Sequence, residues 1–267
     1  MMRSTAFRTA MALGVLVACA AAPAVTAFAD ARSSFIPHRA LYSMKLAKTK
    51  SGSDVIDVDG RMAFEWRREC EGWTVQQHYR IRFFGADGEA NEIASSYNTW
   101  EAIDGKHYRF FVKKHQGGQV KEVSGVAERQ GDIRFAKPEK KTVKLSEQAI
   151  FPSEHTFELI DRALKGEKFF STHLFDGGEF EPDTPVTAVI GRRSEPKPGP
   201  DPDLNGYYWP IRLAFFEAEA KGSEPDYEMS IDLHPNGIAR ALKIDYGDFV
   251  VNVELRKLEI LKGPLGC

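Results

Sequence analysis

A single amphipathic helix in a chain of strands is the feature that most constrains the fold. Within the stretch Phe151–Phe170, the apolar residues Phe157, Ile160 and Leu164 recur at the spacing of one helical stripe. No second helix is expected to cover this stripe, so it must pack against a sheet. We therefore expect a mainly β fold in which this one principal helix packs against one face of a curved sheet.

Both ends of the expected helix carry recognisable signals. Pro152 is compatible with the first turn, and Ser153 is the predicted N-cap because a serine hydroxyl accepts hydrogen bonds from the first backbone N–H groups. Lys165 gives a basic last turn, and Gly166 is the kind of residue that ends a helix. These signals predict a helix that begins near Pro152 and stops at Gly166.

Turn signals at short intervals divide the rest of the chain into strands in which apolar and polar residues alternate. Two-residue turns such as Asp104-Gly105 and Asn236-Gly237 favour hairpins, and a sheet of many strands must curl, close or split. Because the strands are long and glycines are scattered along them, we expect one strongly coiled antiparallel sheet in place of two flat sheets. The expected strands span residues 40–50, 54–68, 73–84, 89–103, 106–115, 119–129, a short segment from 132, 140–145, 168–175, 186–192, 207–218, 227–234, 238–246 and 249–261.

Three irregularities interrupt these patterns. Gly60 inside the second expected strand predicts a bulge or kink, since glycine within a strand often marks one. In the last expected strand the apolar phase switches near Arg256-Lys257, which predicts a bulge there. Arg240 is out of character, because it occupies an apolar phase of its strand.

Residues 1–29 have the three parts of a secretory signal peptide. Arg3 and Arg8 form the basic region, an apolar run covers residues 9–22, and Ala27-Phe28-Ala29 is a small-x-small cleavage site. We therefore predict export and cleavage after Ala29, which leaves residues 30–267 as a single β domain. The competing interpretation is a lipoprotein lipidated at Cys19, but the apolar run continues past that cysteine and a conventional site follows.

Export leaves two cysteines, Cys70 and Cys267, in an oxidising compartment. An isolated pair has one connectivity, and a bond between them would fasten the C-terminus to an early hairpin. The alternative is a free, buried Cys70 and a frayed C-terminus. A metal site is a poorer interpretation, because no CxxC or Cys/His spacing is present.

The charge balance excludes one class of function. Removing Arg3 and Arg8 from 36 basic residues leaves 34 against 38 acidic residues, so no basic excess favours nucleic-acid binding. The proline-rich segment Ser194–Gly206 is expected to be an extended surface loop, with partner docking as the less favoured interpretation.

Motifs for catalysis or cofactor binding are missing from the sequence. It has no G-x-S-x-G, no H-E-x-x-H, no phosphate loop and no dinucleotide fingerprint, so we expect neither catalytic residues nor a cofactor. His78, His107 and His115 lie on neighbouring expected strands, where unrelated positions are favoured over a metal site. His155, in the first helical turn, is expected to bond a loop carbonyl and fix the helix start. The hypothesis of a glycosidase with two catalytic carboxylates has almost no support, because acidic residues are common on solvent-exposed faces. The four carboxylates that could supply such a pair are Glu65, Glu92, Glu101 and Asp104.

Several segments together resemble one protein family. The segment LYSMKLAKTKSGSDVIDVDGRMAFEW (Leu41–Trp66) resembles the opening signature of the EipB family of cell envelope integrity proteins. Later stretches agree in order: Phe151-Pro152, His155-Thr156, Gly166–Phe170 and Phe175-Asp176-Gly177, together with Cys70 and Cys267, which match the family's disulfide. The resemblance covers essentially the whole chain after residue 29.

This resemblance implies that residues 30–267 form a single β-spiral domain of antiparallel strands, an incompletely closed barrel with the principal helix on its concave side. The resemblance further implies residence in the periplasm of alphaproteobacteria and a role in envelope homeostasis. It also implies association with periplasmic proteins that bear tetratricopeptide repeats, and it supplies no catalytic residues. Three hypotheses for the activity stay open. The first is a non-catalytic protein that binds other envelope proteins, and the second is a carrier of a lipid, an acyl chain or a lipoprotein in a half-open barrel. The third, least favoured, is an enzyme such as an envelope hydrolase. Oligomeric state is not predicted.

Overall fold

The computed structural model describes residues 31–196, 201–216 and 224–264. Its one long helix, α2 (Pro152–Leu164), lies where the sequence predicts it, and a short helix, α1 (Ala31–Ser34), precedes the first strand. A 3₁₀ turn spans Pro202–Leu204. The strands are β1 (His38–Thr49), β2 (Val55–Arg68), β3 (Gly72–Gly85), β4 (Ala90–Ala102), β5 (His107–Gln116), β6 (Gln119–Glu128), β7 (Asp132–Lys137), β8 (Lys141–Lys144), β9 (Ala149–Ile150), β10 (Phe169–Leu174), β11 (Thr184–Ile190), β12 (Trp209–Phe215), β13 (Tyr227–Leu233), β14 (Ala239–Asp245) and β15 (Phe249–Ile260).

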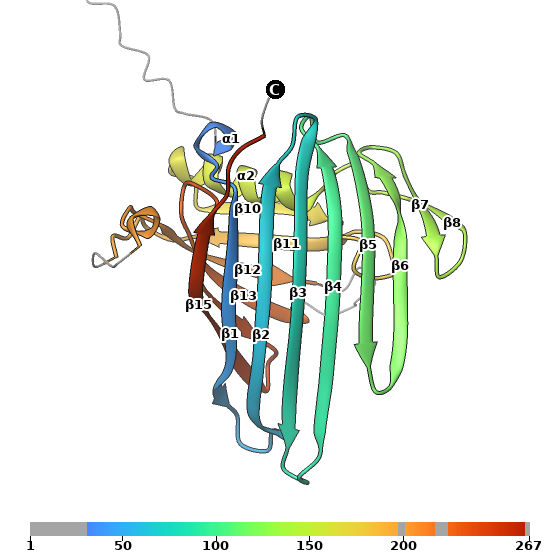
Figure 1. Cartoon of the computed structure of the whole chain (residues 1–267), viewed down its shortest axis with the longest axis vertical. Helices are drawn as coiled ribbons and strands as arrows, with labels where there is room; N and C mark the ends of the chain where they lie inside the picture. Colours follow the sequence, from blue (N-terminus) through green and yellow to red (C-terminus); the bar gives the residue numbers. More distant parts are fainter. Residues whose placement is uncertain (1–30, 197–200, 217–223, 265–267) are drawn as a thin grey trace, which may run out of the picture.

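The strands form one 15-stranded sheet whose order is β8-β7-β6-β5-β4-β3-β2-β1-β15-β14-β13-β12-β11-β10-β9. Neighbouring strands are antiparallel, except that the two-residue β9, which the sequence does not predict, pairs in parallel with β10. Among the described residues the edge strands β8 and β9 do not pair with each other, so the sheet curls without closing (Figure 1). The prediction of a mainly β, incompletely closed barrel is therefore confirmed.

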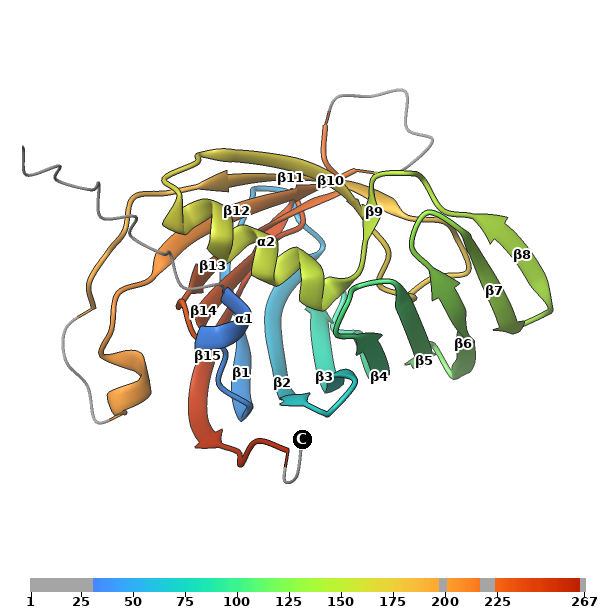
Figure 2. The same cartoon turned by 90° about the horizontal axis from the view of Figure 1, so that it is seen from above.

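The helix lies inside the curl. Figure 2 shows α2 between β2–β4 on one side and β10–β12 on the other. Phe157 and Ile160 are buried at 1% and 0% exposure, and the ring of Phe157 lies 5.4 Å from that of Trp66 and 4.9 Å from that of Trp73. Burial of these large apolar side chains is the main favourable contribution to folding. The predicted stripe therefore faces the sheet, as expected.

Alternate residues of each strand face opposite sides of the sheet, as strand geometry requires. We call the side that faces α2 the concave face and the other side the convex face. In β1 the concave residues Ala40, Tyr42 and Met44 are buried, while the convex residues Arg39 and Leu41 are exposed. Below the helix, the concave side chains of β1, β2, β3 and β15 form their own buried cluster around Val58, Ile81, Val251 and Val253.

The two ends of α2 differ in how well the sequence predicts them. Ser153 is not the N-cap. Phe151 occupies the N-cap position, and its side chain makes no hydrogen bond that caps the helix. At the other end, Gly166 has a φ of +78°, its N–H bonds the carbonyl of Ala163, and the N–H of Glu167 bonds the carbonyl of Arg162. This pair of hydrogen bonds is a Schellman motif, so the stop predicted at Gly166 is confirmed.

The predicted irregularities have three different outcomes. The register between β1 and β15 shifts at Arg256, as predicted. Arg240 lies at a second shift, between β13 and β14, which explains its unexpected phase. At Gly60 the prediction of a bulge is wrong, because both neighbouring ladders run through it in register. A Cβ atom at that position would come within 2.8 Å of the carbonyl oxygen of Arg80, so Gly60 allows close strand contact instead.

The N-terminal segment, Cys19 and Cys267 lie outside the described residues, so the cleavage site and the disulfide partner stay predictions. The strand ends are compatible with the disulfide. His38 of β1 pairs with Trp66 on one side and with Ile260 on the other, so the outgoing ends of β2 and β15 lie two strand spacings apart, about 10 Å. Cys70 is four residues beyond Trp66, in the turn that leads into β3.

Candidate functional site

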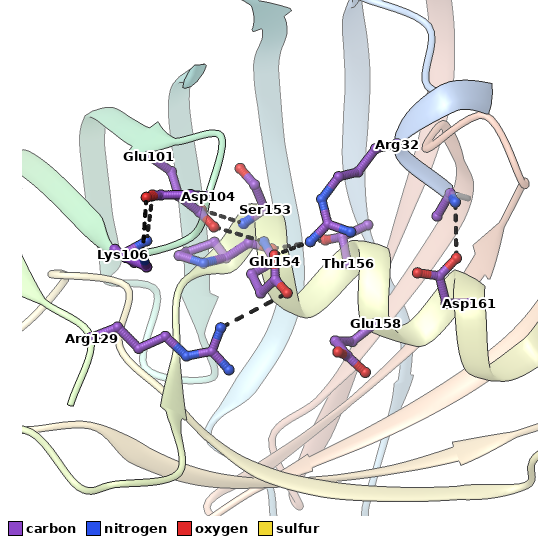
Figure 3. Close-up of polar contacts among 12 residues, drawn as sticks. Arg32, Glu101, Asp104, Lys106, Arg129, Ser153, Glu154, Thr156, Glu158 and Asp161 are labelled. Carbon is purple, nitrogen blue, oxygen red and sulfur yellow. Dashed lines mark hydrogen bonds and ion pairs between the residues drawn. The ribbon is translucent and has the colours of Figure 1, made fainter. Parts of the chain in front are cut away.

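A buried carboxylate from β4 anchors the start of α2 (Figure 3). Oε2 of Glu101 accepts a hydrogen bond from the backbone N–H of Ser153 at 2.7 Å, and Oε1 accepts one from the N–H of Glu154 at 2.8 Å. The first N–H groups of a helix lack partners within the helix, and its dipole favours negative charge there. Glu101 therefore supplies the cap that the sequence assigns to Ser153.

Burial changes the acid–base chemistry at this end of the helix. Burial raises the pKa of Glu101 to about 7, and the two backbone N–H groups offset part of that rise. Burial lowers the pKa of His155 to about 4. The ring of His155 stacks on Phe170 at 5.9 Å, and its Nε2 has no hydrogen-bond partner among the described residues. The expected bond from His155 to a loop carbonyl is therefore not made through that atom.

Ion pairs join the chain's first described residues to the helix. Arg32 of α1 pairs with Glu154, and Arg129 approaches the same carboxylate with Nη1 4.0 Å from Oε1 (Figure 3). Two turns further on, Oδ1 of Asp161 accepts a hydrogen bond from the N–H of Ala31 at 2.9 Å. These polar groups hold α2 in place, so this constellation is an anchor of the fold.

The four carboxylates considered for glycoside hydrolysis are not assembled into a pair. Glu65 and Glu92 lie on the convex face and bind arginines of their own or neighbouring strands. Glu101 lies on the concave side, and Asp104 occupies the turn between β4 and β5, 3.8 Å from Lys106. None of the four lines either of the two grooves described below.

The candidate histidines are only partly brought together. His78 of β3 and His115 of β5 line one groove on the convex face, whereas His107 lies at the opposite end of β5. Within the described part of the chain, no group of three or more His, Cys, Asp or Glu side chains is arranged to hold a metal ion.

One histidine does contact a carboxylate. Nδ1 of His173 lies 2.7 Å from Oδ2 of Asp183, and the same carboxylate accepts hydrogen bonds from the N–H and the hydroxyl of Ser146. Both the serine and the histidine therefore bind the aspartate, whereas nucleophilic catalysis needs a serine that binds the histidine. Neither groove includes this cluster, which ties the loop before β9 to the loop before β11.

The motif Phe175-Asp176-Gly177 has a structural explanation. The hydroxyl of Tyr108 donates to the carbonyl of Asp176 at 2.9 Å, and Oδ1 of Asp176 accepts from the N–H of Gly178 at 2.7 Å. Gly177 has a φ of +72°, and a Cβ there would lie 2.5 Å from the ring of Phe110. The motif therefore packs a tight turn against β5.

The convex face carries a groove of ≈ 730 Å³ across β1–β5. Its floor is made of small side chains, among them Ser43, Ala63, Ala94 and Ser96, and longer side chains rise around them. The longer residues include six that carry or can accept positive charge: Arg61, His78, Arg80, Lys113, His115 and Arg256. None of its lining residues, all within the described chain, is an aspartate or a glutamate.

A second groove, of ≈ 300 Å³, lies further along the same face of β3–β5. There the guanidinium of Arg109 lies over the ring of Trp100 at 4.6 Å, and Phe111 is exposed. The two grooves adjoin, since the amide of Asn98 in the second donates to the hydroxyl of Ser96 in the first at 3.2 Å.

The concave face determines how much room a carried lipid would have. Beside α2 it is filled, because Phe157, Ile160 and Ala163 are buried against the sheet. Below the helix, half-buried side chains surround the buried cluster around Val58 and Ile81, and aromatic residues are among them: Tyr79, Tyr97, Phe83, Tyr227 and Phe249. No helix among the described residues is long and apolar enough to cross a membrane.

Together, the open curled sheet and the helix in its concavity define a class of barrel-like β proteins with a non-closed sheet. A crystal structure of a beta-barrel-like protein of a domain of unknown function from Brucella abortus has this fold, with a TM-score of 0.78, 30% identity and coverage of 85% of this chain and 99% of that chain. The EipB-like family model matches residues 29–262, and this chain belongs to that family. A relative in Brucella abortus (strain 2308), the cell envelope integrity protein EipB, is 32% identical over 97% of both chains.

Sequence reasoning missed two arrangements. The role of Glu101 as the cap of α2 depends on a contact across 52 residues, and no local signal marks it. The convex groove depends on strand register, although the signal for it was present: arginine and histidine recur at the polar phase of neighbouring strands.

Proposed function

We propose that this protein supports the integrity of the cell envelope as a non-catalytic periplasmic protein that binds other envelope proteins. The observation that carries the proposal is the 32% identity, over 97% of both chains, to a relative named for cell envelope integrity. Partners that bear tetratricopeptide repeats are the first class to test.

The polar clusters support the non-catalytic part of the proposal. Glu101, His155, His173 and Asp183 each contact groups that hold the helix or a loop, and none of them lines either groove. A catalytic acid or base needs a substrate within hydrogen-bond reach. The contacts that these side chains make within the fold account for their positions.

The envelope role is tested in a strain that lacks the protein. We expect greater sensitivity to detergent and to antibiotics that act on the cell wall, with rescue by the full chain and no rescue by a chain without residues 1–29. A strain as resistant as the parent would contradict the role. Equal rescue by the chain without its N-terminal segment would contradict export.

Partner binding is tested with a photo-crosslinking residue placed on the outer surface of the sheet. Phe169 is 71% exposed and lies directly opposite Val189, itself 44% exposed. An exposed aromatic side chain is the kind of residue that anchors protein interfaces. We expect a crosslinker at Phe169 to capture an envelope protein in living cells. As the matched control, a crosslinker at the half-buried Phe170, which stacks on His155 on the other face of the same strand, should capture nothing. Equal products from both positions would contradict specific binding.

The alternative is a carrier of a lipid, an acyl chain or a lipoprotein, and the half-buried aromatic surface below α2 favours it. Native mass spectrometry of protein taken from the periplasm separates the two functions. A bound mass in the range of a phospholipid would move the assignment to the carrier. A bare chain would leave the partner-binding function as the better account.

A further inference from the structure

The convex groove contains two arginines that face each other on neighbouring strands, an arrangement that does not favour strand pairing. Arg61 of β2 and Arg80 of β3 are direct cross-strand partners, so their Cβ atoms lie roughly 5 Å apart on one face. Like charges at such positions destabilise a sheet. This pairing of two arginines therefore carries a cost to stability, and a ligand that needs both of them would account for that cost.

Two register rows build the groove. In the first row Ser43, Arg61, Arg80, Ala94 and His115 are successive partners across β1–β5. The neighbouring row on the same face runs through Leu41, Ala63, His78, Ser96 and Lys113. The arginines thus rise beside small residues, which leave space next to both guanidinium groups.

Protein carboxylates only partly neutralise these charges. Arg61 makes no ion pair with a carboxylate of the described residues, and Arg80 lies 3.5 Å from Glu92, which binds Arg82 more closely at 2.8 Å. Lys113 and Arg256 have carboxylate partners at the groove's margin. Glu122 is shared between Lys113 and Lys137, and Glu254 binds Arg256.

Two serine hydroxyls among the residues that line the groove accept hydrogen bonds from neighbouring polar side chains. Oγ of Ser43 accepts a hydrogen bond from Nε of Arg256 at 2.7 Å, and Oγ of Ser96 accepts one from the amide of Asn98 at 3.2 Å. Each hydroxyl still has its own hydrogen to donate. Paired guanidinium forks flanked by hydroxyl donors match the several oxygens and double charge of a phosphate group better than a single carboxylate.

We propose that the convex groove binds a phosphate-bearing ligand, with Arg61 and Arg80 holding the phosphate group. The phosphate belongs either to a soluble phosphate ester or to a lipid headgroup with a terminal phosphate. The inference goes beyond the proposed envelope role and does not depend on it, because the groove and the partner surface tested at Phe169 lie on different strands.

The test measures binding to the chain of residues 30–267 with two probes. Inorganic phosphate is titrated by calorimetry, and vesicles of phosphatidylcholine with and without phosphatidic acid are tested by co-sedimentation. Arg61→Gln and Arg80→Gln should each weaken binding about tenfold or more, because each removes a charge-assisted hydrogen-bonding group. Ala94→Phe should weaken it as well by filling the floor without changing the charge. Arg134→Gln, which removes a convex-face charge outside the groove, is the matched control and should bind as the parent does.

Each result has a defined meaning. Groove-dependent binding of free phosphate assigns a soluble ester, and groove-dependent binding of the phosphatidic acid vesicles alone assigns a lipid headgroup. Absence of binding to both probes overturns the proposal. Equal losses in Arg134→Gln and in the groove variants also overturn it, because they would show a general charge effect. Binding of a poly-glutamate peptide that depends on Arg61 and Arg80, without binding of either phosphate probe, would reassign the groove to an acidic protein segment.

Discussion

The two faces of strands β1–β5 are built by the same backbone and have opposite characters. On the concave face Tyr42, Ile81 and Tyr108 are buried against other parts of the chain. In the groove on the convex face, the lining side chains that can carry charge are all basic, and Arg61 and Arg80 are direct cross-strand partners. The concave face is arranged for stability, whereas the convex face keeps a like-charge pair that stability does not favour.

This difference separates structural from functional evidence. A buried apolar residue is explained by packing alone. A charge arrangement that weakens the sheet needs another explanation, since strained or unfavourable features tend to persist where they serve a function. Substitutions on the two faces should therefore change stability in opposite directions.

The largest effect is expected from Ile160→Asp, which places a charge under α2 at a position with 0% exposure. Loss of packing and burial of an unpaired carboxylate should cost at least about 5 kcal/mol, enough to prevent stable folding. Circular dichroism and thermal melting measure it, with Glu158→Gln on the partly exposed side of α2 as control. A cooperative melt close to that of the parent protein would show that the concave face tolerates charge.

The next largest effect concerns the predicted disulfide between Cys70, in the turn that leads into β3, and Cys267. Cys70→Ser should lower the free energy of unfolding of the oxidised protein by roughly 2–4 kcal/mol, because a bond to Cys267 would close a long loop. Reductant should destabilise the parent protein and leave Cys70→Ser unchanged. If the parent protein melts at the same temperature with and without reductant, the predicted bond does not stabilise it.

The buried carboxylate of the concave side predicts a pH effect. The folded pKa of Glu101 is raised to about 7 from an ordinary value of 4.5, so its stabilising contribution is fully present below pH 4.5 and is lost as pH rises through 7. Relative to Glu101→Gln, the parent protein should therefore lose on the order of 2 kcal/mol of unfolding free energy between pH 5 and pH 8. Denaturant titrations at several pH values measure this difference.

His155 is a second buried group whose shifted pKa makes stability depend on pH, but it does not disturb the comparison. Its pKa is lowered to about 4 in the fold, so its contribution is present above pH 6.5 and is lost as pH falls through 4, the opposite slope. Both proteins contain His155, so its effect cancels from the difference between them. A difference that does not change from pH 5 to pH 8 would contradict a raised pKa of Glu101.

The smallest effect belongs to the convex face. Arg61→Gln should stabilise the protein by about 0.2–0.5 kcal/mol, because it removes the repulsion of Arg80 across the strand pair. The gain should shrink in high salt, which screens exposed charges. Arg134→Gln, whose guanidinium pairs with Glu128, should not stabilise the protein. A loss of stability in Arg61→Gln would show that the like-charge pair is compensated within the protein.

Much of the fold was predictable from local pattern. Alternation along β3 and the spacing of Phe157 and Ile160 identify the buried faces, and turns such as Asp104-Gly105 set the hairpins. The bulge at Arg256 was also predictable, because a phase switch in one strand has a direct structural meaning.

The remaining features depend on contacts between distant segments. Ser153 has the local chemistry of a cap, yet Glu101 takes that role because β4 ends beside the helix start. From the sequence alone Gly60 predicts a bulge, whereas the structure places the carbonyl of Arg80 against it. The convex groove likewise follows from which residue of one strand faces which residue of the next, and a single sequence does not state that register.

The pairing of β1 with β15 has a consequence for the order of folding. The first and the last strand lie side by side in the middle of the sheet, and both edges, β8 and β9, come from the middle of the chain. A chain delivered from its N-terminus can form the hairpins of β1–β8 as they appear, because their contacts are local. One side of β1 then stays open until the final 12-residue strand arrives. Until that moment an unpaired strand edge is available to other chains, so the pairing of β15 with β1 is also the step that protects the sheet from aggregation.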